Sequence, residues 1–456
     1  MTPTPRAAKR SGSRKTLTQA NLEALGAEKL ALLLLAAAEE DAHLKRRLRM
    51  NLAGEVGAED LAGEVAKRMA ALEARRARVS ARGYKGFARD LDLQRAMIVG
   101  PLAGLDPGLA LAHLCRFLAM GPAMLSLTRD PRGLVADVFA AAAQSAPALV
   151  KVARVEPATV ARALGALVEG DRGGLYPDLL EQVAPGLEAA ARKALRTELE
   201  QRWGEHRRMD RLRRAVRLLA DLDADVDAYL ATFTDAERSE PETGGTIARR
   251  LIAAGRLQEA EAALRSAAPK QGVGQGRAAW EDAQIALAEA QGRPDEAQEL
   301  RWAAFERALR TAPLRDHLKR LSGFDDVEAE ERAMASAKAH ARFSDALAFL
   351  IAWPSIPDAA QLVLERAGEI DPARTELLEA AADLLEARHP IAASLLLRAM
   401  IVDTLRWRRT DRAQAAGDQI DRLENLAAQI ADWNGVMTHE AFVEGISRLV
   451  AQRRPR

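Results

Sequence analysis

The sequence predicts an all-α protein in which pairs of helices stack into a superhelix. Of its 456 residues, 48% are hydrophobic and only 4% are aromatic. Most of the apolar residues are alanine and leucine, which favour helices, whereas strands favour β-branched and aromatic side chains. Apolar residues also recur every three or four positions, and proline or glycine separates these segments. We therefore expect stacked helical hairpins in an α–α superhelix, preceded by a helical N-terminal region.

Changes in composition divide the chain into three regions. Residues 1–16 contain five basic residues and no acidic residue, which predicts a disordered basic tail. Residues 17–241 form the expected N-terminal helical region, and residues 246–450 form the expected repeat region. The segment ETGGT, residues 242–246, is polar and contains two glycines, so we expect the boundary there.

The segment EKLALLLLAAAEED, residues 28–41, has two interpretations. A basic stretch precedes an apolar run that ends in small residues, as in a secretion signal. Glu23 and Glu28 lie upstream of the run, however, and Thr18 caps a helix before it, so we favour a buried helix. No apolar run approaches the ~20 residues that a membrane span needs. We therefore expect a cytoplasmic protein with no membrane partner.

Local signals indicate where helices begin and which faces form the core. Helical spacing places Leu61, Val65, Met69 and Leu72 on one face. The only cysteine, Cys115, lies among apolar residues, so we expect it to be buried and reduced. Proline is tolerated at the first position of a helix, because the N–H that it lacks has no partner there. We therefore expect four helices to start at Pro107, Pro131, Pro157 and Pro177.

A short pattern recurs four times in the C-terminal half. Each copy has a small residue, then arginine, three variable residues and alanine, beginning with AAGRLQEAEAALRSA at residues 253–267. The small residue ends one helix, and the alanine lets the next helix pack closely against it. The four turns start 37, 49 and 46 residues apart. Their small residue and alanine are Gly255 and Ala260, Gly292 and Ala297, Ala341 and Ala346, and Ala387 and Ala392.

The first two turns resemble those of tetratricopeptide repeats, which often contain G-x-x-x-E-A. Because the intervals exceed the usual ~34 residues, the resemblance implies degenerate units. The chain as a whole resembles a family of uncharacterised proteobacterial all-helical proteins, a domain of unknown function; the resemblance begins at residues 15–34 and is clearest over residues 341–405. A similar C-terminal region occurs in bacterial proteins that carry a SWIM-type zinc finger. This chain lacks the cysteines of that finger, so the resemblance implies no zinc or nucleic-acid role.

The strongest charge feature is RWGEHRRMDRLRRAVRLL, residues 202–219, which we expect to lie on one long helix with a continuous apolar stripe. Arg207, Arg208, Arg211 and Arg214 form a candidate face for an anionic partner. The alternative, which we favour, is a solvated face neutralised by pairs such as Glu198–Arg202 and Asp210–Arg214. The formal net charge of +1 gives no global field toward nucleic acid.

Motifs for catalysis, cofactors and metals fail on inspection. The chain has no P-loop, and GVGQGR at residues 272–277 follows no expected strand, so we interpret it as a loop. The aspartates of DLDADVDAYL lack the glycine and glutamate of a calcium loop, so we expect a helix end and a capped restart. Phe343, Phe349 and Trp353 have core spacing, with a groove for a partner peptide as the alternative.

These observations predict a non-enzymatic helical-repeat scaffold that binds another protein or a peptide, without cofactor or metal. Two other functions stay open. One is a nucleic-acid-associated accessory protein that uses the basic helix, and the other is an enzyme without a recognisable motif.

Overall fold

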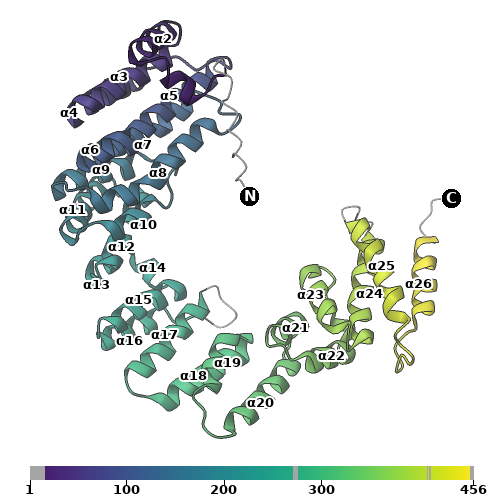
Figure 1. Ribbon diagram of the computed structural model, residues 1–456. Helices are drawn as coiled ribbons and strands as arrows, with labels where there is room; N and C mark the ends of the chain where they lie inside the picture. Colours follow the sequence, from purple (N-terminus) through teal and green to yellow (C-terminus); the bar gives the residue numbers. More distant parts are fainter. Residues whose placement is uncertain (1–15, 271–275, 408, 410–411, 452–456) are drawn as a thin grey trace, which may run out of the picture. The chain divides into compact units, whose positions relative to one another are not determined.

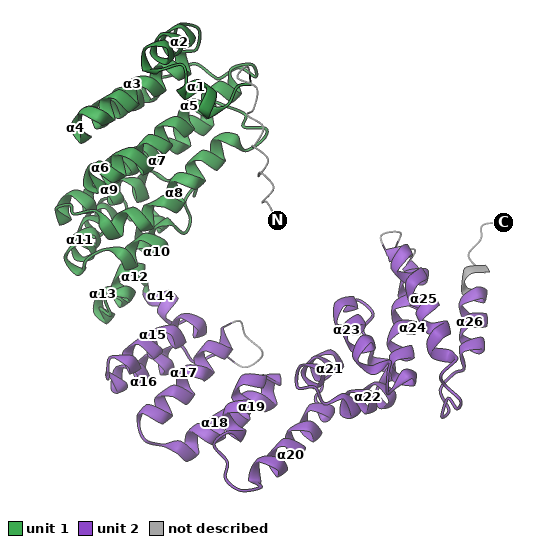
Figure 2. Ribbon diagram, in the orientation of Figure 1, with its two compact units in different colours: residues 1–234 green, residues 235–456 purple. Residues whose placement is uncertain are grey.

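The computed structural model describes residues 16–270, 276–407, 409 and 412–451. All regular secondary structure in this part of the chain is helical, which confirms the predicted all-α class. The chain divides into two compact units, residues 1–234 and 235–456 (Figures 1 and 2). Residues 1–15 of the predicted tail and residues 272–275 of the predicted GVGQGR loop lie outside the described residues.

In unit 1 each helix packs mainly against helices that are near it in the chain, as in α3 with α4, α7 with α8 and α9 with α11. The elements of this unit are α1 (Gln19–Glu23), α2 (Ala27–Glu40), α3 (Ala42–Val56), α4 (Ala58–Glu73), α5 (Tyr84–Met97), the π-helix η1 (Ile98–Leu102), α6 (Ala103–Leu105), α7 (Pro107–Ser126), α8 (Leu134–Val152), α9 (Pro157–Gly170), α10 (Leu179–Val183), the 3₁₀-helix η2 (Ala184–Gly186), α11 (Ala189–Glu205), α12 (Asp210–Leu222) and α13 (Val226–Ala231).

The predicted core face of α4 is confirmed, because Leu61, Val65, Met69 and Leu72 are all buried. Cys115 is also buried, as predicted. Two of the four predicted helix starts are confirmed, because Pro107 and Pro157 occupy the first position of α7 and α9. The other two prolines, Pro131 and Pro177, lie in the turns before α8 and α10, which begin at Leu134 and Leu179.

Helices α7 and α8 have the length and apolar composition of membrane spans, at 20 and 19 residues. The prediction that no apolar run approaches that length is therefore wrong for these two helices. Isolated polar residues such as His113 and Arg116 interrupt the apolar run in α7, but the mean hydropathy of the helix stays in the range of membrane spans. Core helices of a folded unit meet the same criterion, and here Phe117 of α7 stacks on Phe139 of α8 with ring centroids 4.8 Å apart.

The predicted burial of the helix at residues 28–41 is wrong. This segment forms α2, and Ala38 is its only buried residue among those described. Helix α2 packs against α1 and α3 at one end of unit 1, where no other described element of this unit lies over its outer side (Figure 2). Periodicity alone predicts an apolar helix but cannot tell what covers it, so the difference lies in packing.

Unit 2 continues as a succession of helices that again pack on their chain neighbours. Its elements are α14 (Asp235–Arg238), α15 (Pro241–Ala253), α16 (Leu257–Ser266), α17 (Arg277–Ala290), α18 (Pro294–Ala308), α19 (Thr311–Leu318), α20 (Asp325–Ala339), α21 (Phe343–Ala352), α22 (Ile356–Glu365), the 3₁₀-helix η3 (Ala367–Glu369), α23 (Thr375–Leu385), α24 (Pro390–Trp407), α25 (Ala413–Ala427) and α26 (His439–Ala451).

The four predicted turns each join two helices of unit 2, namely α15–α16, α17–α18, α20–α21 and α23–α24. The alanine of every turn is buried: Ala260, Ala297, Ala346 and Ala392. Gly255 and Gly292 have φ angles of +74° and +70°, the left-handed backbone expected of glycine there. Ala341 and Ala387 occupy the corresponding positions without a left-handed backbone, so the last two turns are built differently.

The predicted boundary at residues 242–246 is wrong, because this segment lies inside α15 and the units divide between Thr234 and Asp235. Its two glycines serve close packing. A Cβ atom on Gly245 would lie 2.5 Å from the carbonyl oxygen of Ala279 in α17, and one on Gly244 would overlap the Cβ of Ala267. Glycine and polar residues therefore mark a helix contact here and not a linker.

Candidate functional site

The basic segment at residues 202–219 forms two helices, α11 and α12, joined by a turn at residues 206–209, so the prediction of one long helix is wrong. The sequence contains the reason. At 3.6 residues per turn, the nine positions from Trp203 to Leu212 rotate the helix by about two and a half turns. The stripe ending at Trp203 and the one beginning at Leu212 would therefore lie on opposite sides of a straight helix. The break at residues 206–209 lets both faces pack.

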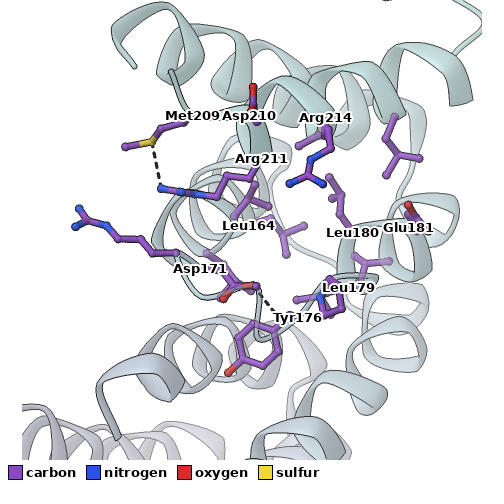
Figure 3. Close-up of a pocket in the computed structure, with 18 of the residues that line it drawn as sticks. Leu164, Asp171, Tyr176, Leu179, Leu180, Glu181, Met209, Asp210, Arg211 and Arg214 are labelled. Atoms are coloured by element: carbon purple, nitrogen blue, oxygen red, sulfur yellow. Dashed lines mark hydrogen bonds between the residues drawn. The ribbon is translucent and has the colours of Figure 1, made fainter. Parts of the chain in front are cut away.

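This break opens a pocket of about 580 Å³ in unit 1 between α12 and the segment that runs from α9 to α10 (Figure 3). Its floor is apolar and includes Leu164 and Leu167 of α9, Leu179 and Leu180 of α10, and Leu218 of α12. Charged side chains stand around this floor: Asp171, Arg172, Glu181, Arg208, Asp210, Arg211 and Arg214. The pocket thus combines a leucine-rich floor with a rim that carries four arginines.

The structure brings three of the four predicted arginines to the pocket, Arg208, Arg211 and Arg214. Arg208 and Arg214 are exposed and form no ion pair with any described residue. Arg211 is held in place, because its Nε donates to the carbonyl oxygen of Glu169 at 3.0 Å. The fourth, Arg207, does not line the pocket and lies over the ring of Trp203 at 4.6 Å from the centroid.

Sequence reasoning missed a further arginine of the rim, Arg172, which follows α9 and is also exposed without an ion pair among the described residues. It lies 30 residues before Arg202, the first residue of the basic segment, and next to Gly173 and Gly174. Only the neighbouring turn residues could have marked this loop, and nothing in its sequence indicates that it meets α12.

The charge pairs proposed for the basic segment are half right. Glu198 accepts hydrogen bonds from Arg202 Nε at 2.8 Å and Nη2 at 2.6 Å, as predicted. Asp210 pairs with Arg213 at 3.2 Å and not with Arg214. Asp210 pairs with Arg213, three positions on, because Arg214 extends over the pocket (Figure 3). The guanidinium of Arg214 therefore has no carboxylate partner among the described residues.

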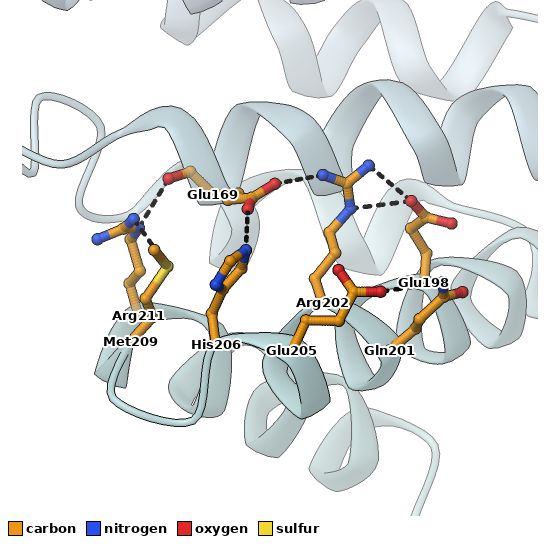
Figure 4. Close-up of polar contacts among 8 residues, drawn as sticks. All are labelled: Glu169, Glu198, Gln201, Arg202, Glu205, His206, Met209 and Arg211. Atoms are coloured by element: carbon orange, nitrogen blue, oxygen red, sulfur yellow. Dashed lines mark hydrogen bonds and ion pairs between the residues drawn. The ribbon is translucent and has the colours of Figure 1, made fainter.

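Glu169, the penultimate residue of α9, fixes the turn that carries Arg208 (Figure 4). Its carboxylate forms a short ion pair with Arg202 and lies 3.3 Å from Nε2 of His206. Its carbonyl oxygen accepts the Arg211 hydrogen bond. One residue of α9 thus contacts the end of α11, the turn and the start of α12, which holds the rim of the pocket together.

The loop below the pocket, residues 171–178, is anchored from both ends. The Asp171 carboxylate accepts hydrogen bonds from the backbone N–H groups of Leu175 at 2.8 Å and Tyr176 at 2.9 Å. The phenol of Tyr176 donates to the carbonyl oxygen of Leu118 in α7 at 2.8 Å. Burial, with the nearby Asp171 charge, raises the pKa of Tyr176, so it remains a hydrogen-bond donor. The pocket floor is therefore tied to the core of unit 1.

Other predicted sites have structural roles. Asp223 ends α12 and Asp225 caps α13 by accepting from the N–H of Ala228 at 3.0 Å, which confirms the predicted helix end and restart. In the part of the chain that the structure describes, no group of three histidine, cysteine or carboxylate residues could hold a metal ion. Phe343 and Phe349 are buried in the core of unit 2, as the core interpretation predicted.

The comparison with protein families decides the identity of the chain. The model of the Family of unknown function (DUF6880) matches residues 12–207 and 197–455. The chain belongs to this family. The two matched DUF6880 segments together span both units and include every residue of the pocket rim. No curated protein and no solved structure matches the chain. Membership of DUF6880 therefore assigns no activity, and the geometry has to carry the functional argument.

Proposed function

We propose that this chain is a non-enzymatic scaffold that holds an acidic, leucine-bearing segment of a partner protein in the unit 1 pocket. One observation carries the proposal. Arg172, Arg208 and Arg214 surround a leucine floor, and none of them forms an ion pair with a described residue. An exposed guanidinium binds carboxylates through paired hydrogen bonds, and a leucine floor binds apolar side chains.

The pocket has the size and lining of a site that anchors side chains. Its volume of about 580 Å³ falls within the range of ligand pockets, which is roughly 300–1,000 Å³. Leu164, Leu167 and Leu179 at its floor are buried, so they are already fixed before a ligand arrives. A peptide that places leucine-like side chains on this floor would bring acidic residues beside them within reach of the rim.

The rim carries more free positive charge than free negative charge. Asp171 is committed to the N–H groups of its own loop, and Asp210 is committed to Arg213. This leaves Glu181 to oppose Arg172, Arg208 and Arg214. A ligand with two or more carboxylates compensates this excess, which gives the pocket its preference for acidic segments.

The scaffold part of the proposal rests on the helical hairpins of unit 2. The four turns with buried alanines agree with degenerate tetratricopeptide-like units, and such units stack into solenoids that bind partners on extended surfaces. We propose that the hairpins form such a solenoid within unit 2. A cytoplasmic location and the proteobacterial origin implied by the family resemblance remain predictions of the same kind.

Nucleic acid is the second candidate, and the exposed arginines of the rim favour it. The carboxylates of Glu181 and Asp210 and the leucine floor oppose it, because a phosphate backbone gains nothing from leucine and is repelled by acids. The aromatic residue nearest the basic turn, Trp203, is covered by Arg207 and is not free to stack on a base.

An enzyme is the third candidate. The residues that line the pocket include no histidine, cysteine or serine, and two of its three carboxylates are engaged, Asp171 by backbone N–H groups and Asp210 by Arg213. This composition supports binding over catalysis.

The test compares proteins that co-purify with the full chain and with the double variant Arg208→Gln/Arg214→Gln from the native host, with nuclease in both preparations. We expect at least one protein to be lost with the variant. An acidic, leucine-bearing peptide from that protein should bind the wild type, and it should bind the variant at least tenfold more weakly. Its affinity for the wild type should fall as the salt concentration rises. The matched control is Arg82→Gln/Arg89→Gln, two exposed arginines of unit 1 outside the pocket.

Two results would overturn the proposal. One is an identical set of bound proteins for the wild type and the pocket variant. The other is capture that occurs only in a third preparation without nuclease, together with binding to a DNA duplex that depends steeply on salt, which would assign the rim to nucleic acid. Circular dichroism of both double variants establishes that the helices are intact.

A further inference from the structure

Helix α2 has an apolar surface that the described residues of unit 1 leave uncovered. Leu32, Leu33, Leu34 and Leu35 follow one another, and each is exposed, with Leu32 and Leu35 at 62% and 63% of their full surface. Successive residues differ by about 100° around a helix, so these four leucines surround the axis. A helix that is apolar on all sides is normally a buried one.

The exposed surface continues onto α3. Leu52 and Val56 lie one turn apart on α3 and are 67% and 75% exposed. In Figure 2 both helices lie at the end of unit 1 that is far from α12 and α13. The terminal layer of a stacked helical protein normally has a polar outer face, which keeps it from associating. The α2–α3 surface instead exposes large apolar side chains between its charges, so it is suited to association.

The two ends of the given sequence lack the composition to cover the α2–α3 surface. Residues 1–15 and 452–456 contain no leucine, isoleucine, valine or aromatic residue. An apolar helix cannot be shielded by a segment of prolines, serines and basic residues, because such a segment buries too little apolar area.

The charges beside the leucines favour a second copy. Glu28, Glu39 and Glu40 of α2 are exposed, and so are Lys45, Arg47 and Arg49 of α3, with Lys29 as the one basic residue of α2. None of the six forms an ion pair with a described residue. In a two-fold symmetric pair, acids on α2 of one copy can face bases on α3 of the other, and each such contact occurs twice.

An anionic membrane fits this surface less well. A helix that lies in a membrane interface has one polar face toward water, whereas the four leucines of α2 surround its axis. Glutamates at both ends of α2 would also be repelled by anionic lipids. Burial between protein helices covers all sides of α2 at once.

We propose that the α2–α3 surface is a homodimer interface, in which α2 packs against α2 and α3 of a second copy. The test is the mass of the full chain in solution at rising concentration, measured by light scattering after gel filtration. We expect a mass of twice 49.4 kDa for the wild type. The variant Leu32→Gln/Leu35→Gln should remain at the mass of one chain. Leu384→Gln, an exposed leucine of α23 in unit 2, is the matched control and should remain dimeric.

A charge exchange tests the arrangement independently of the leucines. Glu39→Lys/Glu40→Lys and Lys45→Glu/Arg49→Glu should each weaken the dimer at least tenfold, and mixing the two variants should restore a heterodimer. A wild type that stays at 49.4 kDa at all concentrations overturns the proposal, as does a dimer that survives Leu32→Gln/Leu35→Gln. Binding of a monomeric wild type to anionic phospholipid vesicles, lost in the leucine variant, would assign the surface to a membrane. None of these outcomes depends on the pocket.

Discussion

The phenolic oxygen of Tyr176 donates a hydrogen bond to the carbonyl oxygen of Leu118, 2.8 Å away in the middle of α7. This carbonyl lacks its usual partner, because the residue four positions on is Pro122, which has no N–H. Gly121 makes the approach possible, since a Cβ atom there would overlap the Tyr176 oxygen. The adjacent Gly121 and Pro122 of α7 and the distant Tyr176 thus join the pocket loop to the core.

Tyr176→Phe should lower the free energy of unfolding by about 1–3 kcal/mol, because it leaves a buried carbonyl without a donor. The measurement is equilibrium denaturation in urea. Pro122→Ala provides a matched background, since its new N–H can donate to Leu118. The same tyrosine change should cost clearly less in that background. An equal cost in both backgrounds would show that the hydrogen bond to Leu118 is not what Tyr176 contributes.

Glu169→Gln should loosen the turn at residues 206–209 and weaken binding in the pocket by a few-fold. The change removes the charge that pairs with Arg202 and faces His206, an interaction of partly exposed groups worth ~1 kcal/mol. Hydrogen exchange of the turn amides measures the loosening. Glu205→Gln is the control, because Glu205 is exposed and accepts only a long hydrogen bond from Gln201, at 3.4 Å. Equal exchange in both variants would contradict the role of Glu169.

Gly245→Ala should destabilise unit 2 by about 1–3 kcal/mol, because the new methyl group would force α15 away from the backbone of α17. Gly417→Ala in α25 is the control. Its added Cβ meets nothing within 4 Å, so alanine there should stabilise the helix by roughly 0.5–1 kcal/mol. Thermal unfolding followed by circular dichroism separates the two directions. A neutral Gly245→Ala would mean that α15 and α17 tolerate a wider separation.

Unit 1 should lose stability in acid as Asp225 becomes protonated. The hydrogen bond from the Ala228 N–H and the nearby Arg196, 2.8 Å away, lower the pKa of this carboxylate from its ordinary 3.8. A group with a lowered pKa stabilises the fold above its unfolded pKa, and the contribution is lost as the pH falls through the folded value. Asp225→Asn keeps a capping side chain without the charge. Its unfolding free energy should vary less between about pH 5 and about pH 3 than that of the wild type.

The fold class and the hairpin turns were predictable because they depend on local pattern. Alanine and leucine content gives helices, and the glycine before Arg256 or Arg293 gives a left-handed turn. The pocket was not predictable in the same way, because Leu164, Arg172 and Arg214 meet only through the packing of α9 and α12. One signal was available in the sequence. The half-turn shift between the apolar stripes at Trp203 and Leu212 indicates the break beside which the pocket opens.

The isolation of Cys115 has a practical consequence for following this protein in solution. It is the only cysteine of the chain, and burial within unit 1 raises the pKa of its thiol to about 12. Thiol reagents act on thiolates, so Cys115 should react slowly in the folded chain. Its thiol should become fully reactive only on unfolding. A single cysteine introduced at Asp178, an exposed residue beside the pocket, or at Glu55, an exposed residue of α3, would accept a fluorophore without replacing a residue of either proposed contact. Ligand capture at the pocket and self-association at α2 could then be observed separately, each through its own label.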